Sequence, residues 1–532
     1  MFKRFHFTGL LAAFLLLPVL AAGQGHLDRL HTIDVLQYNF EIHLNDHSNL
    51  LHGKADIRIE FKQDCQGFNL DLTGVRPSGK GMRILDLKED DGECSYEHIQ
   101  DEIRIQTRAR VGEIKTYTIV YEGIPSDGLI ISTNKFGDRT FFADNWPNRG
   151  HHWLPLVDHP SDKATVQFLV EVPSHYSVIS NGILAWEERS STRYVCQWVT
   201  RVPLSTKLMV IGVSPFAVEH SQSASGVPVS TWVYPQNREE GFYDFRPGLQ
   251  VMDYFESLIG PYPYAKLAHV QSKTVYGGME NASCIFYNEG AVTGRREDED
   301  LIAHEMAHQW FGDGVSEADW HHIWLSEGFA TYLENMYMEH RYGEERLTGI
   351  MQRERDTVLA YGRETHRPIL DTTLAVGIKL LSPNSYEKAG WVLHMLRAEL
   401  GDSLFRDCLQ SFYRKFTYGN ALTEDFQAVV DSVSGRDFGP FFDQWLKQPG
   451  QPLVSARVRE RGKQTFLEVQ QHQVEGFFFP LEVEFLLEDG RQVRETFRVE
   501  EKQHRFPIDP GGKIRSITLD PRTRLLFAPF GS

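Results

Sequence analysis

The segment from Asp300 to Thr331 constrains this chain more than any other part of the sequence, because it carries histidines and acids at the spacing of a metal site. His304, Glu305 and His308 form an H-E-x-x-H pattern, and Glu327 follows His308 after 18 intervening residues. Residues four apart lie one above the other on one face of a helix, so both imidazoles can point at one ion. The apolar residues that would bury this helix are Leu301, Ile302, Ala303, Met306 and Ala307.

Two imidazoles and one carboxylate predict a catalytic rather than a structural zinc site, because they leave the fourth tetrahedral position open for water. We therefore expect one Zn²⁺ bound by His304, His308 and Glu327. Glu305 lies about 100° further round the helix. It cannot point where the histidines point, and is the candidate general base. Glu334 follows Glu327 by seven residues and is a candidate to orient a ligand histidine.

A chance match is the alternative for this segment, since two histidines on a helix are often only partly buried surface residues. The chain has 22 histidines, which leaves room for an accidental H-E-x-x-H. The sequence W-L-S-E-G-F-A-T around Glu327 stands at the distance that a third ligand would need, and argues against chance.

A second motif, Y-G-G-M-E-N from Tyr276 to Asn281, precedes His304 by 23 residues. As a pair, the two motifs resemble the signature of the M1, or gluzincin, zinc aminopeptidases, the family that includes aminopeptidase N and leukotriene A4 hydrolase. The resemblance continues through G-P-Y-P-Y at Gly260–Tyr264 and Y-E-K-A-G at Tyr386–Gly390. The resemblance is close in the middle of the chain. The parts before and after it are similar only in their general type of pattern.

The resemblance implies roles for residues outside the metal motif. Gly277 and Gly278 would pair with the peptide backbone, and Glu280 would hold the free α-ammonium group of a peptide substrate. Tyr386 would donate a hydrogen bond to the oxyanion during hydrolysis. The alternatives are a buried structural carboxylate at Glu280 and a packing role for Tyr386.

The first 23 residues have the pattern of a secretory signal peptide: Lys3 and Arg4, an apolar run from Leu10 to Leu20, and small residues at its end. An uncleaved anchor is the alternative. No other apolar run is long enough for a transmembrane helix, so we expect no integral membrane segment in the mature chain and a secreted or periplasmic location. The net charge of −17 argues against nucleic acid as a partner.

Hydrophobic patterning predicts a multidomain α+β protein. After the signal peptide (1–23), residues 24–220 alternate with period two and predict a β-rich domain, which the family resemblance makes saddle-like. The polar stretch Ser221–Gly226 is a predicted linker. Residues 221–449 are patterned mainly as helices, thermolysin-like by resemblance, and residues 450–532 return to short strands, predicting a small β-sandwich. The large C-terminal helical domain of many family members is expected to be missing.

Five cysteines are too few and too scattered for a disulfide scaffold or a thiolate metal site: Cys65, Cys94, Cys196, Cys284 and Cys408. Cys65 with Cys94 is the candidate disulfide, and buried thiols are the alternative. Asp144 is a candidate to contact the substrate amine, because the family places a glutamine or glutamate before a similar Arg and Pro. The alternative is an ordinary turn aspartate.

These observations predict a secreted zinc-dependent aminopeptidase that removes single residues from peptides with a free α-amino group. An internally cutting zinc endopeptidase is the alternative if Glu280 is not used. An epoxide hydrolase is disfavoured, because the leukotriene branch carries Asp and Tyr where this chain has Ile378 and Leu381. An inactive peptide-binding scaffold on the same fold is also disfavoured. Such relatives lose a metal ligand or the general base, whereas this chain keeps all of them.

Overall fold

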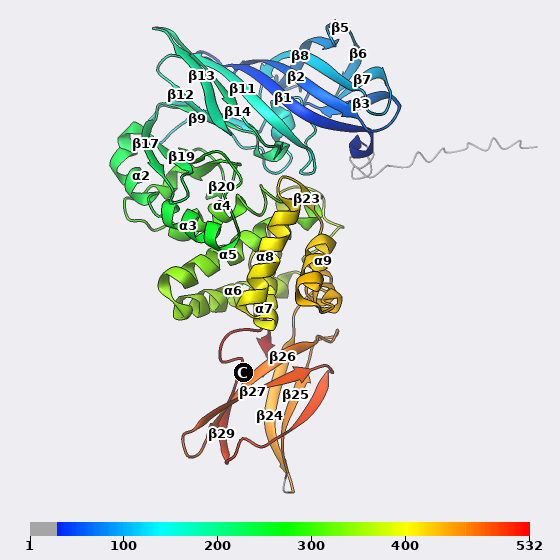
Figure 1. Cartoon of the computed structure of the whole chain (residues 1–532), viewed down its shortest axis with the longest axis vertical. Helices are drawn as coiled ribbons and strands as arrows, with labels where there is room; N and C mark the ends of the chain where they lie inside the picture. The colour runs from blue at the N-terminus through cyan, green and yellow to red at the C-terminus, as the bar shows by residue number, and fades with distance from the viewer. Residues whose placement is uncertain (1–28, 463, 532) are drawn as a thin grey trace, which may run out of the picture.

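The computed structural model describes residues 29–462 and 464–531, which follow one another as a β-rich part, a mainly helical part and a second β part (Figure 1). The predicted mixed α+β organisation is therefore confirmed at this level. The signal-peptide prediction for residues 1–23 lies outside the described residues. No helix in the described ranges is both long and apolar enough to cross a membrane.

The N-terminal part is built on a large twisted sheet, which lies at the top of Figure 1. Along its central strand, Tyr38, Phe40 and Ile42 are buried while Asn39 and Glu41 are half-buried, as the period-two pattern predicts. The strands run in the order β13 (Ile183–Arg189), β14 (Arg193–Val199), β11 (Lys163–Pro173), β1 (Ile33–His43), β2 (Leu51–Phe61), β8 (Ile114–Ile124), β4 (Gly81–Glu89) and β5 (Gly92–Glu93). Within this order β1 and β11 pair in parallel, and the other pairs are antiparallel.

Two smaller sheets complete the N-terminal part. One runs β12 (Ser177–Ser180), β16 (Ile211–Ser214), β10 (Arg139–Ala143) and β9 (Leu129–Thr133), and the other β3 (Cys65–Asp71), β7 (Glu102–Ala109) and β6 (Ser95–Ile99). Cys65 and Cys94 are both free, so the expected disulfide is absent. Strand β7 lies between the strand that begins at Cys65 and the strand that follows Cys94. Their backbones are therefore two strand spacings apart, about 9–10 Å, which is beyond the reach of a disulfide.

The middle part opens with a mixed sheet in the order β17 (Ala217–Gln222), β18 (Pro228–Val233), β19 (Leu267–Ser272), β21 (Cys284–Asn288) and β20 (Gly278–Met279). The predicted linker Ser221–Gly226 is instead the end of β17 and the turn of the β17–β18 hairpin. The linker prediction was wrong because the polar residues of this turn have the composition of a linker. The boundary expected at residue 220 consequently falls inside a strand. Strand β20 is at the edge of this sheet and pairs with β21.

Helices follow this sheet and supply the core of the middle part. The main ones are α2 (Arg238–Asp244), α3 (Gly248–Leu258), α4 (Glu299–His308), α5 (Trp324–Tyr342), α6 (Glu344–Glu364), α7 (Ala389–Leu400), α8 (Asp402–Phe416), α9 (Thr423–Ser434) and α10 (Gly439–Phe442). Helix α5 is buried along most of its length and packs on α4, α6 and α7. A π-helical turn, η7 (Asn384–Lys388), leads into α7.

The C-terminal part has two sheets, at the bottom of Figure 1. One runs β28 (Gln503–Ile508), β25 (Gln464–Gln471), β24 (Leu453–Arg461) and β30 (Ala528–Pro529), and the other β27 (Gln492–Val499), β26 (Phe479–Leu487) and β29 (Ile514–Leu519). Alternate residues such as Leu467, Leu481 and Phe485 are buried. A hairpin joins β26 to β27, with its turn at residues 488–491.

Candidate active site

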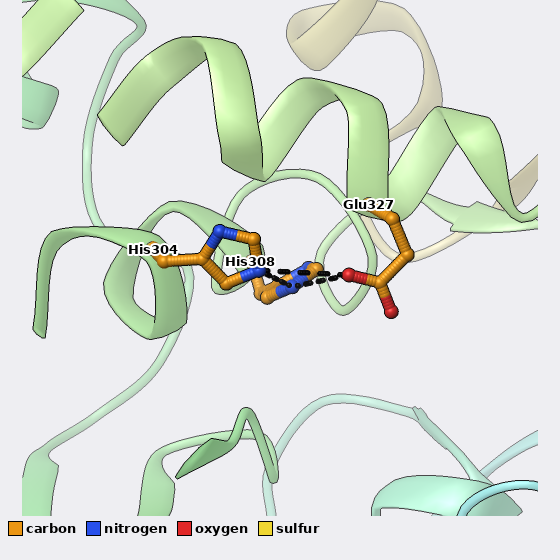
Figure 2. Close-up of side chains that lie close together, drawn as sticks. All are labelled: His304, His308 and Glu327. Carbon is orange, nitrogen blue, oxygen red and sulfur yellow. Dashed lines mark hydrogen bonds and ion pairs between the residues drawn. The ribbon is translucent and has the colours of Figure 1, made fainter. Parts of the chain in front are cut away.

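Helices α4 and α5 bring His304, His308 and Glu327 together (Figure 2). Nε2 of His304 lies 3.2 Å from Nε2 of His308, and Oε2 of Glu327 lies 3.5 Å and 3.3 Å from these two nitrogens. Zinc bonds of about 2.0–2.1 Å give a tetrahedral edge of about 3.3–3.4 Å, close to all three separations. The donor set and its spacing therefore fit a zinc ion with one position left over.

The turn after α4 allows α5 to pack against α4, so that Glu327 reaches the two ligand histidines. The backbone of Gly312 has φ of +125°, which side-chain-bearing residues rarely adopt. A β-carbon there would lie 2.8 Å from Nδ1 of His308 and would overlap Oγ of Ser326. A glycine is thus required both by the backbone conformation and by the close packing against a ligand histidine.

The remaining ring nitrogens of the two histidines are held by protein groups. Nδ1 of His304 lies 3.2 Å from Oε2 of Glu334, the contact predicted from the sequence. Nδ1 of His308 lies 3.0 Å from Oγ of Ser326 and 3.3 Å from the carbonyl oxygen of Phe311. These contacts leave both Nε2 atoms to face Glu327, as metal-binding histidines require.

The charges around the histidines favour an ionised Glu327. Burial would raise its pKa, but the charge of His308 and hydrogen bonds from both histidines hold the pKa of Glu327 well below its ordinary value. Burial would also lower the pKa of His304, but hydrogen bonds to Glu327 and Glu334 raise it well above the ordinary value. Glu327 and Glu334 thus place negative charge beside the histidines, which favours a bound cation.

Glu305 lies beside this triangle rather than in it. It is buried, and burial raises its pKa despite the opposing charges of His304 and His308. A buried carboxylate with a raised pKa can hold a proton near neutral pH, which a general base that later acts as an acid must do.

The edge strand β20 borders Glu305. Gly278 pairs with Tyr287 in the sheet, and the carbonyl oxygen of Gly277 accepts from the backbone N–H of Asn288 at 2.9 Å. Both glycines line the cavity described below.

Glu280 directly follows this strand and is 5% exposed. Its Oε1 is buried and has no hydrogen-bond partner among the described residues. Carboxylate oxygens of Glu280 and Glu305 and a ring nitrogen of His308 lie within 4.8 Å of one another. A buried carboxylate oxygen without a partner is costly, so this group is arranged to receive a donor or a cation.

Tyr386 approaches the site from the π-helical turn η7. Its ring stacks on His304 with centroids 6.1 Å apart, and burial together with the nearby charges of Glu327 and Glu280 raises its pKa well above the ordinary value. The hydroxyl therefore stays protonated and available as a hydrogen-bond donor. Single-turn π-helices are frequent at functional sites.

A cavity of about 420 Å³ joins all of these groups. It is lined by the predicted residues Gly277, Gly278, Glu280, His304, Glu305, His308, Glu327 and Tyr386 and by Glu334. The sequence-predicted site residues thus come together in one place. Their individual roles stay predictions.

Comparison with known proteins bears on the same region. Residues 243–445 match the Peptidase family M1 domain and include every predicted site residue. Aminopeptidase M1 of Arabidopsis thaliana is 27% identical over 328 residues, which are 59% of this chain and 37% of that protein. Leucyl aminopeptidase of Saccharolobus solfataricus is 25% identical over 452 residues, or 79% of this chain and 54% of that protein. Residues 243–445 of this chain are thus identified as a peptidase family M1 domain.

A solved structure shares the fold of the M1 domain and its surroundings. The M1 zinc metallopeptidase of Deinococcus radiodurans has a TM-score of 0.67 at 22% identity, covering 78% of this chain and 94% of that one. A variant of it bound to a Tyr-Ser-Ala substrate gives a TM-score of 0.68 at 23% identity. The chain spans less than two thirds of the length of the aminopeptidases named above.

The cavity is also lined by residues that were not among the predicted site residues: Trp146, Tyr276, Met279, Asp300, Leu301 and Leu381. Trp146 belongs to the N-terminal part and packs edge-to-face on Tyr276 at 6.1 Å and on Trp320 at 5.8 Å between ring centroids. Nothing in its local sequence signals this position, because the contact depends on how the N-terminal part packs on the middle part.

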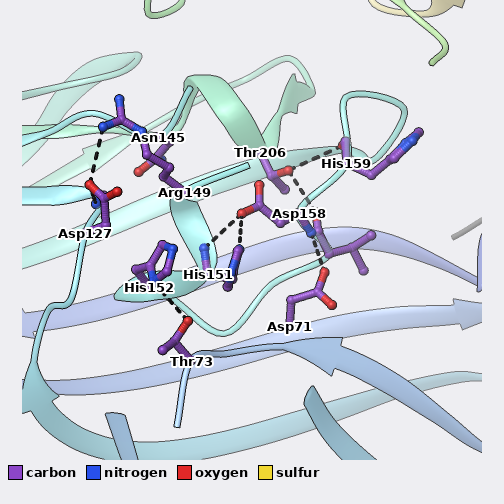
Figure 3. A network of polar contacts seen from close by, with 12 residues as sticks. Asp71, Thr73, Asp127, Asn145, Arg149, His151, His152, Asp158, His159 and Thr206 are labelled. Atoms are coloured by element: carbon purple, nitrogen blue, oxygen red, sulfur yellow. Dashed lines mark hydrogen bonds and ion pairs between the residues drawn. The ribbon is translucent and has the colours of Figure 1, made fainter. Parts of the chain in front are cut away.

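The loop that carries Trp146 is fixed to the N-terminal part by a polar network (Figure 3). Nδ2 of Asn145 donates to the carbonyl oxygen of Met209 at 2.7 Å, and Nδ1 of His151 lies 2.6 Å from Oδ2 of Asp158. His152 contacts Oγ1 of Thr73 at 3.0 Å. The wall formed by Trp146 is therefore anchored on both sides of the tryptophan.

Asp144, the candidate contact for the substrate amine, is not among the residues that line the cavity. Its carboxylate is fully buried, pairs with Arg149 at 2.5 Å, and accepts from Oγ1 of Thr274 at 3.1 Å and the N–H of Val275 at 3.2 Å. Burial raises its pKa despite the charge of Arg149. Asp144 thus fixes the segment that leads to Tyr276 instead of contacting a ligand.

Proposed function

We propose that this protein is a zinc-dependent aminopeptidase that hydrolyses the first peptide bond of peptides with a free α-amino group. The observation that carries the proposal is the unpartnered carboxylate oxygen of Glu280, within 4.8 Å of Glu305 and His308. The names of the aminopeptidases that the chain resembles agree with it.

The short separation between the carboxylates of Glu280 and Glu305 favours an aminopeptidase over an endopeptidase. Within one residue, the amine nitrogen and the carbonyl carbon are about 2.5 Å apart, and each further residue adds up to about 3.3–3.6 Å. An ammonium group held by Glu280 would thus bring the first carbonyl, and not the second, to Glu305. An endopeptidase would need this space for a continuing chain, where Glu280 presents a buried carboxylate oxygen that has no hydrogen-bond partner among the described residues.

The residues that would hold the metal are His304, His308 and Glu327. Zinc bound there supplies a Lewis acid and lowers the pKa of water. Glu305 would take a proton from the attacking water and pass it to the departing amine. The hydroxyl of Tyr386 would donate to the carbonyl oxygen as negative charge develops on it.

The peptide itself would lie along β20. Gly277 and Gly278 line the cavity, and β20 is an edge strand, to which an extended peptide can add as a further strand. We also infer that the middle part is a thermolysin-like catalytic domain, in keeping with the fold likeness to the Deinococcus radiodurans metallopeptidase. The two sheets of the C-terminal part support a β-sandwich there.

We further propose export of the protein to the periplasm or the medium, with cleavage near residue 23. The support is the charged start, short apolar run and small residues of the first 23 positions. N-terminal sequencing of the protein from the periplasmic and medium fractions tests this. A start near residue 24 supports export, and an intact Met1 in the cytosolic fraction contradicts it.

Mass spectrometry of peptide digests tests the activity. Peptides with free and N-acetylated amino groups are incubated with the zinc-loaded protein and with the Glu305→Gln variant. The proposal predicts stepwise loss of N-terminal residues from the free peptides alone, and no loss with the variant. Internal cuts in the acetylated peptides would contradict it.

A further inference from the structure

We infer that Gln309 is the positioning residue that holds Glu280 at a fixed distance from the metal-binding helix, and so makes hydrolysis depend on a free α-amino group. The inference rests on the proposed function. Gln309 directly follows the ligand His308 at the end of α4, and its side chain is fully buried.

Each polar atom of the Gln309 amide makes two hydrogen bonds. Its Oε1 accepts from the backbone N–H of Ser283 at 2.7 Å and from the hydroxyl of Tyr262 at 3.0 Å. Its Nε2 donates to the backbone carbonyl of Glu280 at 2.6 Å and to Oδ2 of Asp313 at 2.8 Å. The full capacity of the amide is used.

These partners also fix the orientation of the amide. The N–H of Ser283 can only donate, and the carbonyl of Glu280 can only accept, so the oxygen must face Ser283 and the nitrogen must face Glu280. A carboxylate or an apolar side chain could not satisfy both. A glutamine can bind both the N–H of Ser283 and the carbonyl of Glu280, which belong to one loop, and so joins this loop to the end of α4.

The far side of this loop is held by other elements. Nδ2 of Asn181 donates to the carbonyl of Ala282 at 2.7 Å, and Nζ of Lys266 donates to the carbonyl of Ser283 at 2.8 Å. These contacts fix residues 282 and 283 relative to the N-terminal part and the sheet. The hydrogen bond from Gln309 reaches the backbone of Glu280 itself, so it links the proposed amine anchor to His308 through a single side chain.

A shift of Glu280 would disturb recognition of the amine more than it would disturb the positions of the metal ligands. The histidines and Glu327 are held by α4, α5 and their own partners, Glu334 and Ser326. Loosening residue 280 should therefore weaken the advantage of a free amine while zinc binding is retained. Misplacement by about 1 Å at a site of this kind can cost about a hundredfold in rate.

The test compares Gln309→Asn with Tyr262→Phe. The asparagine keeps an amide but withdraws it by about one bond length, 1.5 Å, so it cannot reach Glu280 and the helix end together. The phenylalanine removes one hydrogen bond from the same amide and leaves both bonds to the loop. Gln309→Met, which keeps the length without the amide, is the second variant if the asparagine protein does not fold.

The first measurement is the ratio of kcat/KM for a peptide with a free amine to that for its N-acetylated form, with zinc content measured on each protein. Calorimetric binding of L-phenylalanine and N-acetyl-L-phenylalanine to each zinc-loaded protein is the second. We expect Gln309→Asn to lower the kcat/KM ratio at least tenfold and to weaken binding of the free amino acid, with zinc content unchanged. Tyr262→Phe should stay within about twofold of the wild type.

A Gln309→Asn protein that keeps the wild-type ratio and binding would overturn this inference, as would equal losses on both peptides. A wild type that does not prefer the free amine would instead overturn the proposed function, so the two failures are distinguishable.

Discussion

A β-carbon on Gly278 would lie 2.5 Å from Cγ of Glu305 and nearer still to its carboxylate. The edge strand that we propose as the peptide-binding strand therefore touches the proposed general base. Glycine at this position makes room for that base. The same closeness lets a peptide on β20 present its carbonyl to Glu305.

Gly278→Ala should displace Glu305 and lower kcat by about 100-fold, the scale of losing general acid–base catalysis. At Gly277 the nearest heavy atom to an added β-carbon is Cδ1 of Leu301, 3.6 Å away, which is an ordinary contact. Gly277→Ala should therefore lose much less activity. Equal rates for the two variants would argue against the steric role of Gly278.

Glu334→Gln should weaken zinc binding by about 10–100-fold, as loss of a carboxylate partner of a ligand histidine generally does. The carboxylate accepts from Nδ1 of His304 and so favours metal binding by Nε2. Glu339→Gln is the matched control, because Glu339 lies on the same helix and pairs with Arg397 at 2.6 Å instead. Competition with a chelator at pH 7 measures both affinities, and equal affinities would contradict the assignment.

Tyr386→Phe should lower kcat by about 100-fold or more with little change in KM, because its hydroxyl would act only as charge develops on the carbonyl oxygen. Tyr276→Phe also removes a hydroxyl from a cavity-lining ring, and should stay within a few-fold of the wild type. Steady-state kinetics on one unblocked peptide separate the two. A large rise in KM with constant kcat for Tyr386→Phe would point to substrate binding instead.

The folded protein should lose stability below pH 6.5 in part through His269. Burial lowers the pKa of this imidazole to about 4, whereas an unfolded histidine titrates near 6.5. The neutral ring therefore contributes stability that is fully present above pH 6.5 and is lost as pH falls toward 4, up to about 3 kcal/mol. His269→Gln should reduce the fall in unfolding free energy between pH 7 and 4.5, measured by urea denaturation. An unchanged fall would contradict this prediction.

The grouping of His304, His308 and Glu327 could be predicted because helix geometry sets the first two and a motif identifies the third. The Glu334 contact followed from the same helical spacing. Trp146 could not be predicted, since its place in the cavity depends on packing between parts of the chain that are far apart in sequence.

Local patterns also misled in two places. The polar stretch Ser221–Gly226 has the composition of a linker, but strand pairing makes it a hairpin turn. Cys65 and Cys94 lie in similar turn-rich surroundings, yet β7 lies between the strand that begins at Cys65 and the strand that follows Cys94. In each case the deciding factor was a pairing partner, which composition does not show.

Glu280 is proposed to receive the α-ammonium group of the substrate, and the Glu280→Gln variant measures how much this contact contributes. The variant keeps the shape of the side chain and removes its charge. The kcat/KM ratio of an unblocked peptide to its N-acetylated form is measured for the wild type and the variant, with zinc content as the control. We predict a wild-type ratio that falls at least 100-fold in the variant at equal zinc content. An unchanged ratio would contradict the account.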